Sequence, residues 1–419
     1  MVESYYKDFT RNGALLNDED KEKLKMINEE QSQVSLNFSQ NALKYNNEYF
    51  LHITDEAKLD GLPVSAKEAA KEEAKNRDLD GWGITLDYPS YIPVMTYATS
   101  RELRQELYLA KVTCANDGEL SNKPNIQKAL QLKEQRAQLL GYDNHAQFVL
   151  ERRMAKSPQN VFKFLEDLKE PSLSKAKVEA SELLELFHQD YPAQQIEPWD
   201  RSFYAEKLKV KKLDFDEEKL RPYFSLDNVI SGAFETASKL FDLKFIDRPD
   251  IPKYHEDVRV FEVRTNTDNK YIGLFYSDFF PRKTKRAGAW MTNIKSQGMR
   301  DSEVKRPHVA IVCNFTKPTE TKPSLLTLNE VLTLFHEFGH ALHGLLADVT
   351  YTKLSGTSVF WDFVELPSQV MENWAYEKEC LDLFAKHYET GEAMPQDLID
   401  KVASTKKFMS GLALSLIHI

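Results

Sequence analysis

The chain has 419 residues, of which 42% are hydrophobic and 29% charged, and its formal net charge is −10 at pH 7. This composition is ordinary for a globular protein with two subdomains, and the negative charge argues against a nucleic-acid partner or a basic membrane-binding patch. No apolar run approaches the roughly 20 residues of a membrane-spanning helix. Three widely spaced cysteines and a polar start without a signal-peptide pattern lead us to expect a cytoplasmic protein with reduced thiols.

The first half of the chain is predicted to be mostly helical. A long helix is expected over 18–50, and a short, highly charged helix over 67–76. Residues 81–87 and 91–97 contain glycine and proline among apolar residues, so they are predicted to be extended, as a small hairpin. Further helices are expected over 101–115, 124–140, 143–155 and 158–189.

The second half mixes helices with strands. Helices are expected over 200–209, 216–220 and 226–241, and strands over 258–265, 270–280 and 308–315. The first of these strands alternates apolar with polar residues, as a half-buried strand does. A turn at 266–269 would join the first two strands into a hairpin, which predicts a small sheet just before residue 332.

The segment Leu332–His343 contains the pattern H-E-x-x-H in a run of helix formers. Because a helix advances about 100° per residue, His336 and His340 lie on one face about a turn apart, as suits two ligands of one zinc ion. Glu337 leans over the same edge, where it can accept a proton from a water that the metal activates. The pattern also occurs by chance, but burying these residues among apolar neighbours is costly unless they are paired or bind something.

A zinc site of this kind also needs a third protein ligand. The continuation H-x-x-G-x-x-H is excluded, because positions 343 and 346 hold histidine and leucine. Glu365 is a candidate, since it is flanked by apolar residues and follows His340 by 25 positions, enough for a turn at Gly356 and a second helix. Pro367 is expected in the first turn of that helix. Glu372, two turns after Glu365, either accepts a hydrogen bond from a ligating histidine or faces solvent.

Five segments resemble one known family. They are H-E-F-G-H-A-L-H (336–343), D-F-V-E-L-P-S-Q (362–369), E-P-W-D (197–200), K-R-A-G-A-W-M (285–291) and C-N-F (313–315). Over most of its length the chain is similar to the thimet oligopeptidase, oligopeptidase A and peptidyl-dipeptidase family of zinc peptidases, and segments 354–357 and 364–369 are nearest to the bacterial peptidyl-dipeptidase branch. The resemblance implies that His336, His340 and Glu365 bind one zinc ion per chain, that Glu337 is the general base, and that the substrates are short peptides.

The resemblance also implies a fold that is mainly α with a small β-sheet, in which a zincin-like (gluzincin) catalytic core lies inside a helical shell. We expect a helical shell subdomain over 1–195 and a zinc catalytic subdomain over 196–419. Family members carry further sequence at both ends, including a glycine-rich, tyrosine-bearing loop that stabilises the oxyanion, so the chain is expected to be an internal fragment, incomplete at its C-terminal end. The main hypothesis is a zinc metallopeptidase, either a peptidyl-dipeptidase or an oligoendopeptidase. The alternative is an inactive zinc-binding fragment or a helical binding scaffold that lacks this loop.

The small sheet can also bind the substrate in such a peptidase. An extended substrate can pair with an exposed edge strand beside the metal. Residues 287–292, or part of 308–315, can form this edge, and Gly288–Trp290 is the favoured substrate-binding candidate. The other interpretation places both segments in the interior of the sheet.

Overall fold

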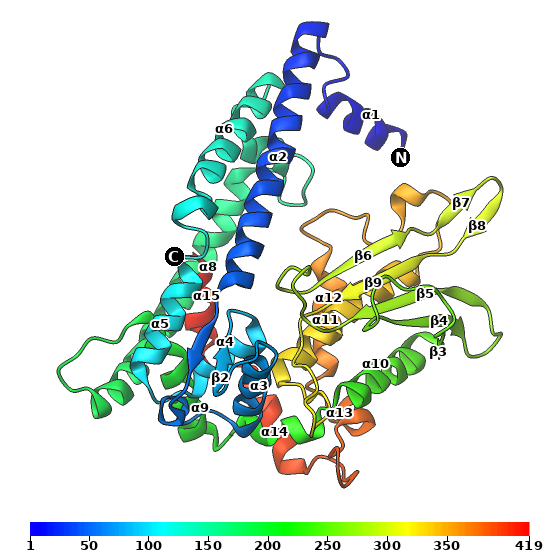
Figure 1. The fold of residues 1–419 in the computed structure, drawn as a ribbon. Coiled ribbons are helices and arrows are strands. Elements are labelled where there is room, and N and C mark those ends of the chain that lie inside the picture. Colours follow the sequence, from blue (N-terminus) through cyan, green and yellow to red (C-terminus); the bar gives the residue numbers. More distant parts are fainter. Residues whose placement is uncertain (419) are drawn as a thin grey trace. The chain divides into compact units, whose positions relative to one another are not determined.

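The computed structural model describes residues 1–418, which are mainly helical with small β-sheets, as the sequence predicts (Figure 1). The chain forms two compact units, the first from Met1–Phe50 and Glu106–Glu170, the second from Leu51–Gln105 and from Pro171 onwards. The predicted boundary at residue 195, between a helical shell subdomain and a zinc catalytic subdomain, stays a prediction. The boundaries of the two compact units lie at other positions. None of the described helices has both the length and the apolar character that a membrane span requires.

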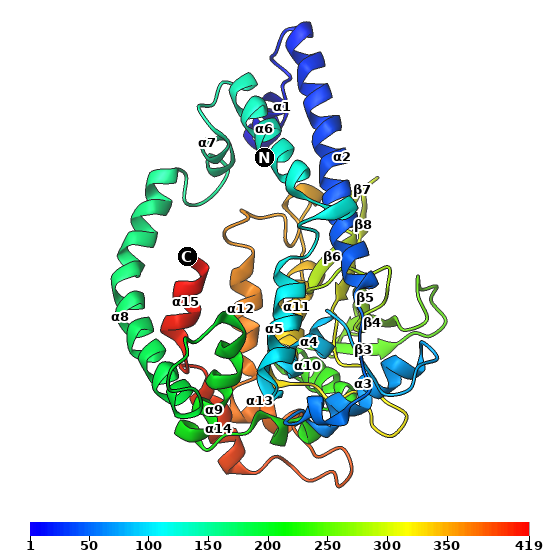
Figure 2. The same ribbon diagram turned by 60° about the vertical axis from the view of Figure 1, so that its left-hand side comes forward.

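The first unit consists of helices. They are α1 (Val2–Arg11), α2 (Asp18–Glu48), α6 (Lys123–Leu139) and α7 (His145–Leu150), with the end of α5 (Arg101–Val112) and the start of α8 (Pro158–Asp190). The side chain of Asn17 accepts a hydrogen bond from the backbone N–H of Asp20, which caps the start of α2. Helices α2 and α6 lie side by side, and each buries apolar residues (Figures 1 and 2).

The predicted hairpin over 81–97 is wrong in its second half. Strand β2 (Trp82–Ile84) pairs instead with β1 (Leu51–Ile53), and the following residues form helix α4 (Tyr88–Tyr97). The apolar run of α4 fits either a helix or a strand, so periodicity alone does not decide between them. Pro89 lies in the first turn, where its missing N–H costs nothing, and burial of Val94 and Met95 favours the helix.

The remaining helices belong to the second unit. They are α3 (Val64–Lys75), α9 (Arg201–Leu213), α10 (Leu226–Phe241), α11 (Leu328–Leu345), α12 (Glu365–Trp374), α13 (Lys378–Phe384), α14 (Gln396–Thr405) and α15 (Ser410–His418). Helix α11 begins with a capping box, in which the Thr327 hydroxyl accepts from the Glu330 N–H and the Glu330 carboxylate accepts from the Thr327 N–H. This cap satisfies backbone groups at the start of α11 and fixes where the helix begins.

A five-stranded sheet lies beside α11. Its order is β3 (Leu243–Asp247), β4 (Arg259–Thr265), β5 (Tyr271–Asp278), β9 (His308–Val312) and β6 (Trp290–Lys295), and only the β5–β9 pairing is parallel. A separate two-stranded ribbon is formed by β7 (Gly298–Arg300) and β8 (Glu303–Lys305). The three predicted strands and the β4–β5 hairpin are confirmed. Of the two candidates for an edge, β6 lies at an edge of this sheet and β9 lies inside it.

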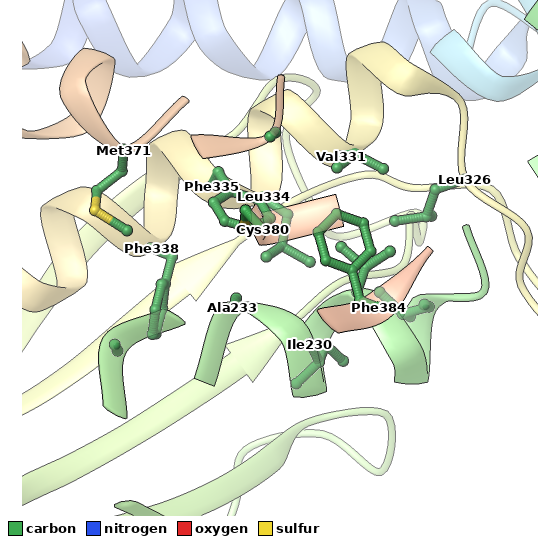
Figure 3. Close-up of a cluster of buried hydrophobic side chains, with 14 of the residues drawn as sticks. Ile230, Ala233, Leu326, Val331, Leu334, Phe335, Phe338, Met371, Cys380 and Phe384 are labelled. Carbon is green, nitrogen blue, oxygen red and sulfur yellow. The ribbon is translucent and has the colours of Figure 1, made fainter. Parts of the chain in front are cut away.

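The largest core of the second unit surrounds α11. The apolar residues of α11 include Val331, Leu334, Phe335 and Phe338, and they pack with Ile230 and Ala233 of α10 and Phe384 of α13 (Figure 3). Sheet residues such as Phe275 and Ile311 belong to the same cluster. Burial of a large apolar side chain is worth about 1.5–3 kcal/mol, so this packing holds α11 rigidly.

The E-P-W-D segment anchors the start of α5 through a buried carboxylate. Asp200 is fully buried and accepts hydrogen bonds from Arg101 (2.8 Å), Arg104 (3.0 Å) and the backbone N–H of Glu197 (3.0 Å). Burial by itself raises the pKa of Asp200, but these donors outweigh it, and the pKa lies below its ordinary value. The segment therefore has a structural role.

Replacing Asp200 by asparagine tests this anchor. The Arg104 guanidinium, which is 1% exposed, would be left without its charged partner, so we expect the free energy of unfolding to fall by about 3–5 kcal/mol in urea denaturation. Asp382→Asn is the control, because it removes the partner of Lys378 in an exposed pair worth about 0.3–0.5 kcal/mol. Equal losses in the two variants would contradict the anchor.

The pH dependence of stability provides a second test. A carboxyl group with a depressed folded pKa stabilises the fold above its unfolded pKa, about 3.9 for aspartate, and this contribution is lost as the pH falls through the folded value. We expect the unfolding free energy of the unsubstituted chain to fall more steeply below about pH 4 than that of Asp200→Asn. Parallel profiles, measured by urea denaturation between about pH 3 and 6, would show that Asp200 does not carry the effect.

Candidate metal centre

Helix α11 and the first turn of α12 bring the three predicted ligands together. The Nε2 atoms of His336 and His340 each lie 3.1 Å from the same carboxylate oxygen, Oε2 of Glu365. All three ligand atoms lie within 4.8 Å of one another. Two imidazole nitrogens and one carboxylate oxygen are a donor set that zinc prefers.

The position of Glu365 depends on a close approach of the two helices. A Cβ atom at Gly339 would lie 2.7 Å from the Cα of Ser368 and 3.0 Å from the carbonyl oxygen of Pro367. Because glycine has no side chain, α12 contacts the backbone of α11 between the two histidines. Pro367 lies in the first turn of α12, as predicted, and the Ser368 hydroxyl donates to the backbone oxygen (2.8 Å) and Oε2 (3.1 Å) of Glu365.

A second carboxylate on α12 holds the first histidine. Nδ1 of His336 lies 2.7 Å from Oε1 of Glu372, which confirms the first of the two interpretations of that glutamate. A carboxylate on one ring nitrogen fixes the orientation of the imidazole and leaves the other nitrogen to act as a ligand. The hydrogen bond to Glu372 raises the pKa of His336, whereas burial lowers the pKa of His340.

Glu337 lies beside these residues without a partner for one carboxylate oxygen. It is 5% exposed, and Oε2 forms no hydrogen bond within the described part of the chain. Burial raises the pKa of Glu337 to about 7, with a further contribution from the Glu365 carboxylate that His336 opposes. A carboxyl group with a pKa near neutrality can both accept and donate a proton at pH 7.

Comparison with known proteins identifies the family of this chain. The family model described as peptidase family M3 matches residues 94–417. The chain belongs to this family. Oligopeptidase A of Salmonella typhimurium is 38% identical over 98% of this chain and 61% of its own length. Dipeptidyl carboxypeptidase of Escherichia coli is 37% identical over 99% of this chain and 61% of its own length. A solved structure of PZ peptidase A with an inhibitor shares 15% identity at a TM-score of 0.49, over 96% of this chain and 53% of that one.

These relatives do not favour one branch of family M3. The matches to an oligopeptidase A and to a dipeptidyl carboxypeptidase have nearly equal identity, so the predicted preference for the peptidyl-dipeptidase branch stays a prediction. The M3 chain spans about three fifths of the length of these two curated relatives.

Two residues that shape this candidate site were not predicted from the sequence. Ser368 contacts the Glu365 carboxylate, and Gly339 lets the helices touch. The signal for Ser368 was its spacing, because residues three apart on a helix are neighbours. The signal for Gly339 was its place within the H-E-x-x-H helix, where glycine is unfavourable unless a close contact requires it.

Replacing Gly339 by alanine tests the helix contact. The added methyl group would push α12 away from α11, so we expect a loss of about 1–3 kcal/mol in unfolding free energy and weaker zinc binding in competition with a chelating dye. Gly232→Ala is the matched control, because its Cβ would meet the Phe384 side chain at 2.4 Å, in the core around α11. It should lose stability and keep its zinc affinity. An unchanged zinc affinity in Gly339→Ala would show that this contact does not determine the position of Glu365.

Proposed function

We propose that this chain is a zinc metallopeptidase that hydrolyses short peptides, with a zincin-like (gluzincin) core inside a helical shell. The observation that carries the proposal is the convergence of His336, His340 and Glu365 beside the unpartnered carboxylate of Glu337. Relatives named oligopeptidase A and dipeptidyl carboxypeptidase support peptides as the substrates. Cleavage as an oligoendopeptidase and removal of C-terminal dipeptides both fit these relatives.

The residues fit one zinc ion per chain. His336, His340 and Glu365 would hold it through two Nε2 atoms and one carboxylate oxygen, and Glu372 would keep the His336 ring oriented. When bound, zinc lowers the pKa of water towards neutrality and polarises the scissile carbonyl. We assign this centre to the proposed catalytic subdomain over 196–419, and the proposed helical shell to 1–195.

Glu337 is proposed as the general base. Its raised pKa suits it to accept a proton from the attacking water and to deliver that proton to the leaving amine. The free edge of β6 is proposed to pair with the extended peptide. This strand lies against the helix that carries the histidines, since a Cβ at Gly344 of α11 would lie 2.8 Å from the Met291 side chain of β6.

The substitution Glu337→Gln distinguishes the role of general base from the role of metal ligand. The variant should retain zinc in elemental analysis and lose at least about 100-fold in turnover of a quenched fluorescent peptide, because the amide accepts no proton. His336→Ala should lose the zinc itself, and a chelator should abolish turnover of the unsubstituted chain.

The same assay tests the base role of Glu337 and distinguishes an active zinc peptidase from an inactive zinc-binding fragment or scaffold. Turnover of Glu337→Gln at the rate of the unsubstituted chain would refute the base role. Zinc binding without peptide hydrolysis by the unsubstituted chain would favour the alternative, an inactive zinc-binding fragment or scaffold.

A further inference from the structure

An exposed segment that leads into β6 is fastened by one side chain. Residues Arg286–Gly288 are exposed and precede the strand at Trp290. The amide Nδ2 of Asn314 donates to the carbonyl oxygens of Arg286 (2.9 Å) and Gly288 (2.6 Å). Because these two carbonyl groups are two residues apart, one amide group closes the turn before the strand. Gly288 has φ +90°, a conformation that a residue with a side chain rarely adopts.

The position of Asn314 is set by the sheet. The backbone N–H groups of its neighbours, Cys313 and Phe315, donate to the carbonyl oxygens of Asp278 and Phe279 at 2.8 Å each, which extends the pairing of β9 with β5. Both neighbours have buried side chains. Successive side chains of an extended chain point to opposite sides, so the Asn314 side chain is directed away from this core and towards the segment before β6.

The other end of the segment is also fastened. Lys285 is buried, and its Nζ donates to Oδ1 (2.9 Å) and the backbone oxygen (3.0 Å) of Asp278 and to the backbone oxygen of Phe280 (2.8 Å). Arg282 donates to both carboxylate oxygens of the same aspartate. The Lys285 contacts and the Asn314 amide together hold the chain before β6 from both sides.

This segment enters the sheet beside the helix that carries the proposed base. Trp290 pairs with Val312, so Ala289 lies across from Cys313. Cys313 belongs to the same buried cluster as Leu334 and Phe335 of α11. Strand β6 therefore begins beside the core that surrounds α11 and lies against this helix, since a Cβ at Gly344 would lie 2.8 Å from the Met291 side chain. One edge of β6 is unpaired among the described strands (Figure 1).

We propose that Asn314 is a positioning residue, which holds Arg286–Gly288 so that the free edge of β6 pairs with a peptide in one register. The proposal rests on the proposed function, since it assigns the substrate backbone to this edge. A flexible edge must be ordered each time a peptide binds, and this cost weakens binding without changing the proton transfers at Glu337.

Steady-state kinetics with a quenched fluorescent peptide test the proposal. Asn314→Ala should raise KM about tenfold and change kcat less than about twofold, because the lost interaction supports the bound substrate and the transition state equally. Asn314→Asp should behave alike, since it keeps the shape of the side chain but cannot donate to the two carbonyl oxygens. Unchanged KM values in both variants would overturn the proposal.

Asn266→Ala is the matched control. The Asn266 amide donates to the Ser238 hydroxyl (2.8 Å) and the Leu243 carbonyl oxygen (3.1 Å), so it fastens a turn beside β3, at the opposite edge of the same sheet. This variant should match the Asn314 variants in thermal stability and retain the KM of the unsubstituted chain. A KM increase in Asn266→Ala equal to that in Asn314→Ala would reduce Asn314 to a general structural role and overturn the proposal.

Amide hydrogen exchange, followed by mass spectrometry without any peptide, keeps this proposal separate from the proposed function. Exchange over residues 286–295 should be about tenfold faster in Asn314→Ala and unchanged in Asn266→Ala. Unchanged exchange in Asn314→Ala overturns the proposal even if the enzyme is active. If the unsubstituted chain has no turnover, the proposed function fails in this chain, while faster exchange still supports Asn314 as the residue that orders β6.

Discussion

The contact between α11 and α12 at Gly339 is the constraint on which the site depends. It brings the first turn of α12 over the two histidines, so that one oxygen of Glu365 lies 3.1 Å from both Nε2 atoms. The apolar face of α11 is packed in the largest core of the second unit, which opposes rotation of the helix to relieve the contact. The capping box at Thr327 fixes the start of the helix that carries His336, Glu337 and His340.

The buried carboxylates Asp200, Asp278 and Glu337 differ in how their oxygens are satisfied. Asp200 and Asp278 are paired with arginine or lysine side chains, and both have a pKa below the ordinary value although burial opposes it. Glu337 has a carboxylate oxygen without a partner and a raised pKa. Since an unsatisfied buried polar group destabilises the folded state, the position of Glu337 beside two histidines supports its proposed role as general base.

The segments that resemble the family have distinct roles in the structure. E-P-W-D supplies the carboxylate that anchors the start of α5. K-R-A-G-A-W and C-N-F meet at the entrance to β6, where Lys285 and Asn314 hold the exposed turn between them. The two helical motifs form the candidate metal centre. The edge of the sheet therefore packs against the helix that carries the histidines, through Met291 beside Gly344 and through Cys313 in the buried core around α11.

The sequence by itself determined the features that depend on local periodicity and capping. These are the long helices, the β4–β5 hairpin, and the helix that places His336 and His340 on one face, because residues four apart always share a helix face. Tertiary packing decided that residues 88–97 form a helix, since their apolar run fits either period and burial chose between them. It also decided that β6 lies at an edge and that Glu365 reaches both histidines, because strand order and helix approach depend on contacts between residues distant in the sequence.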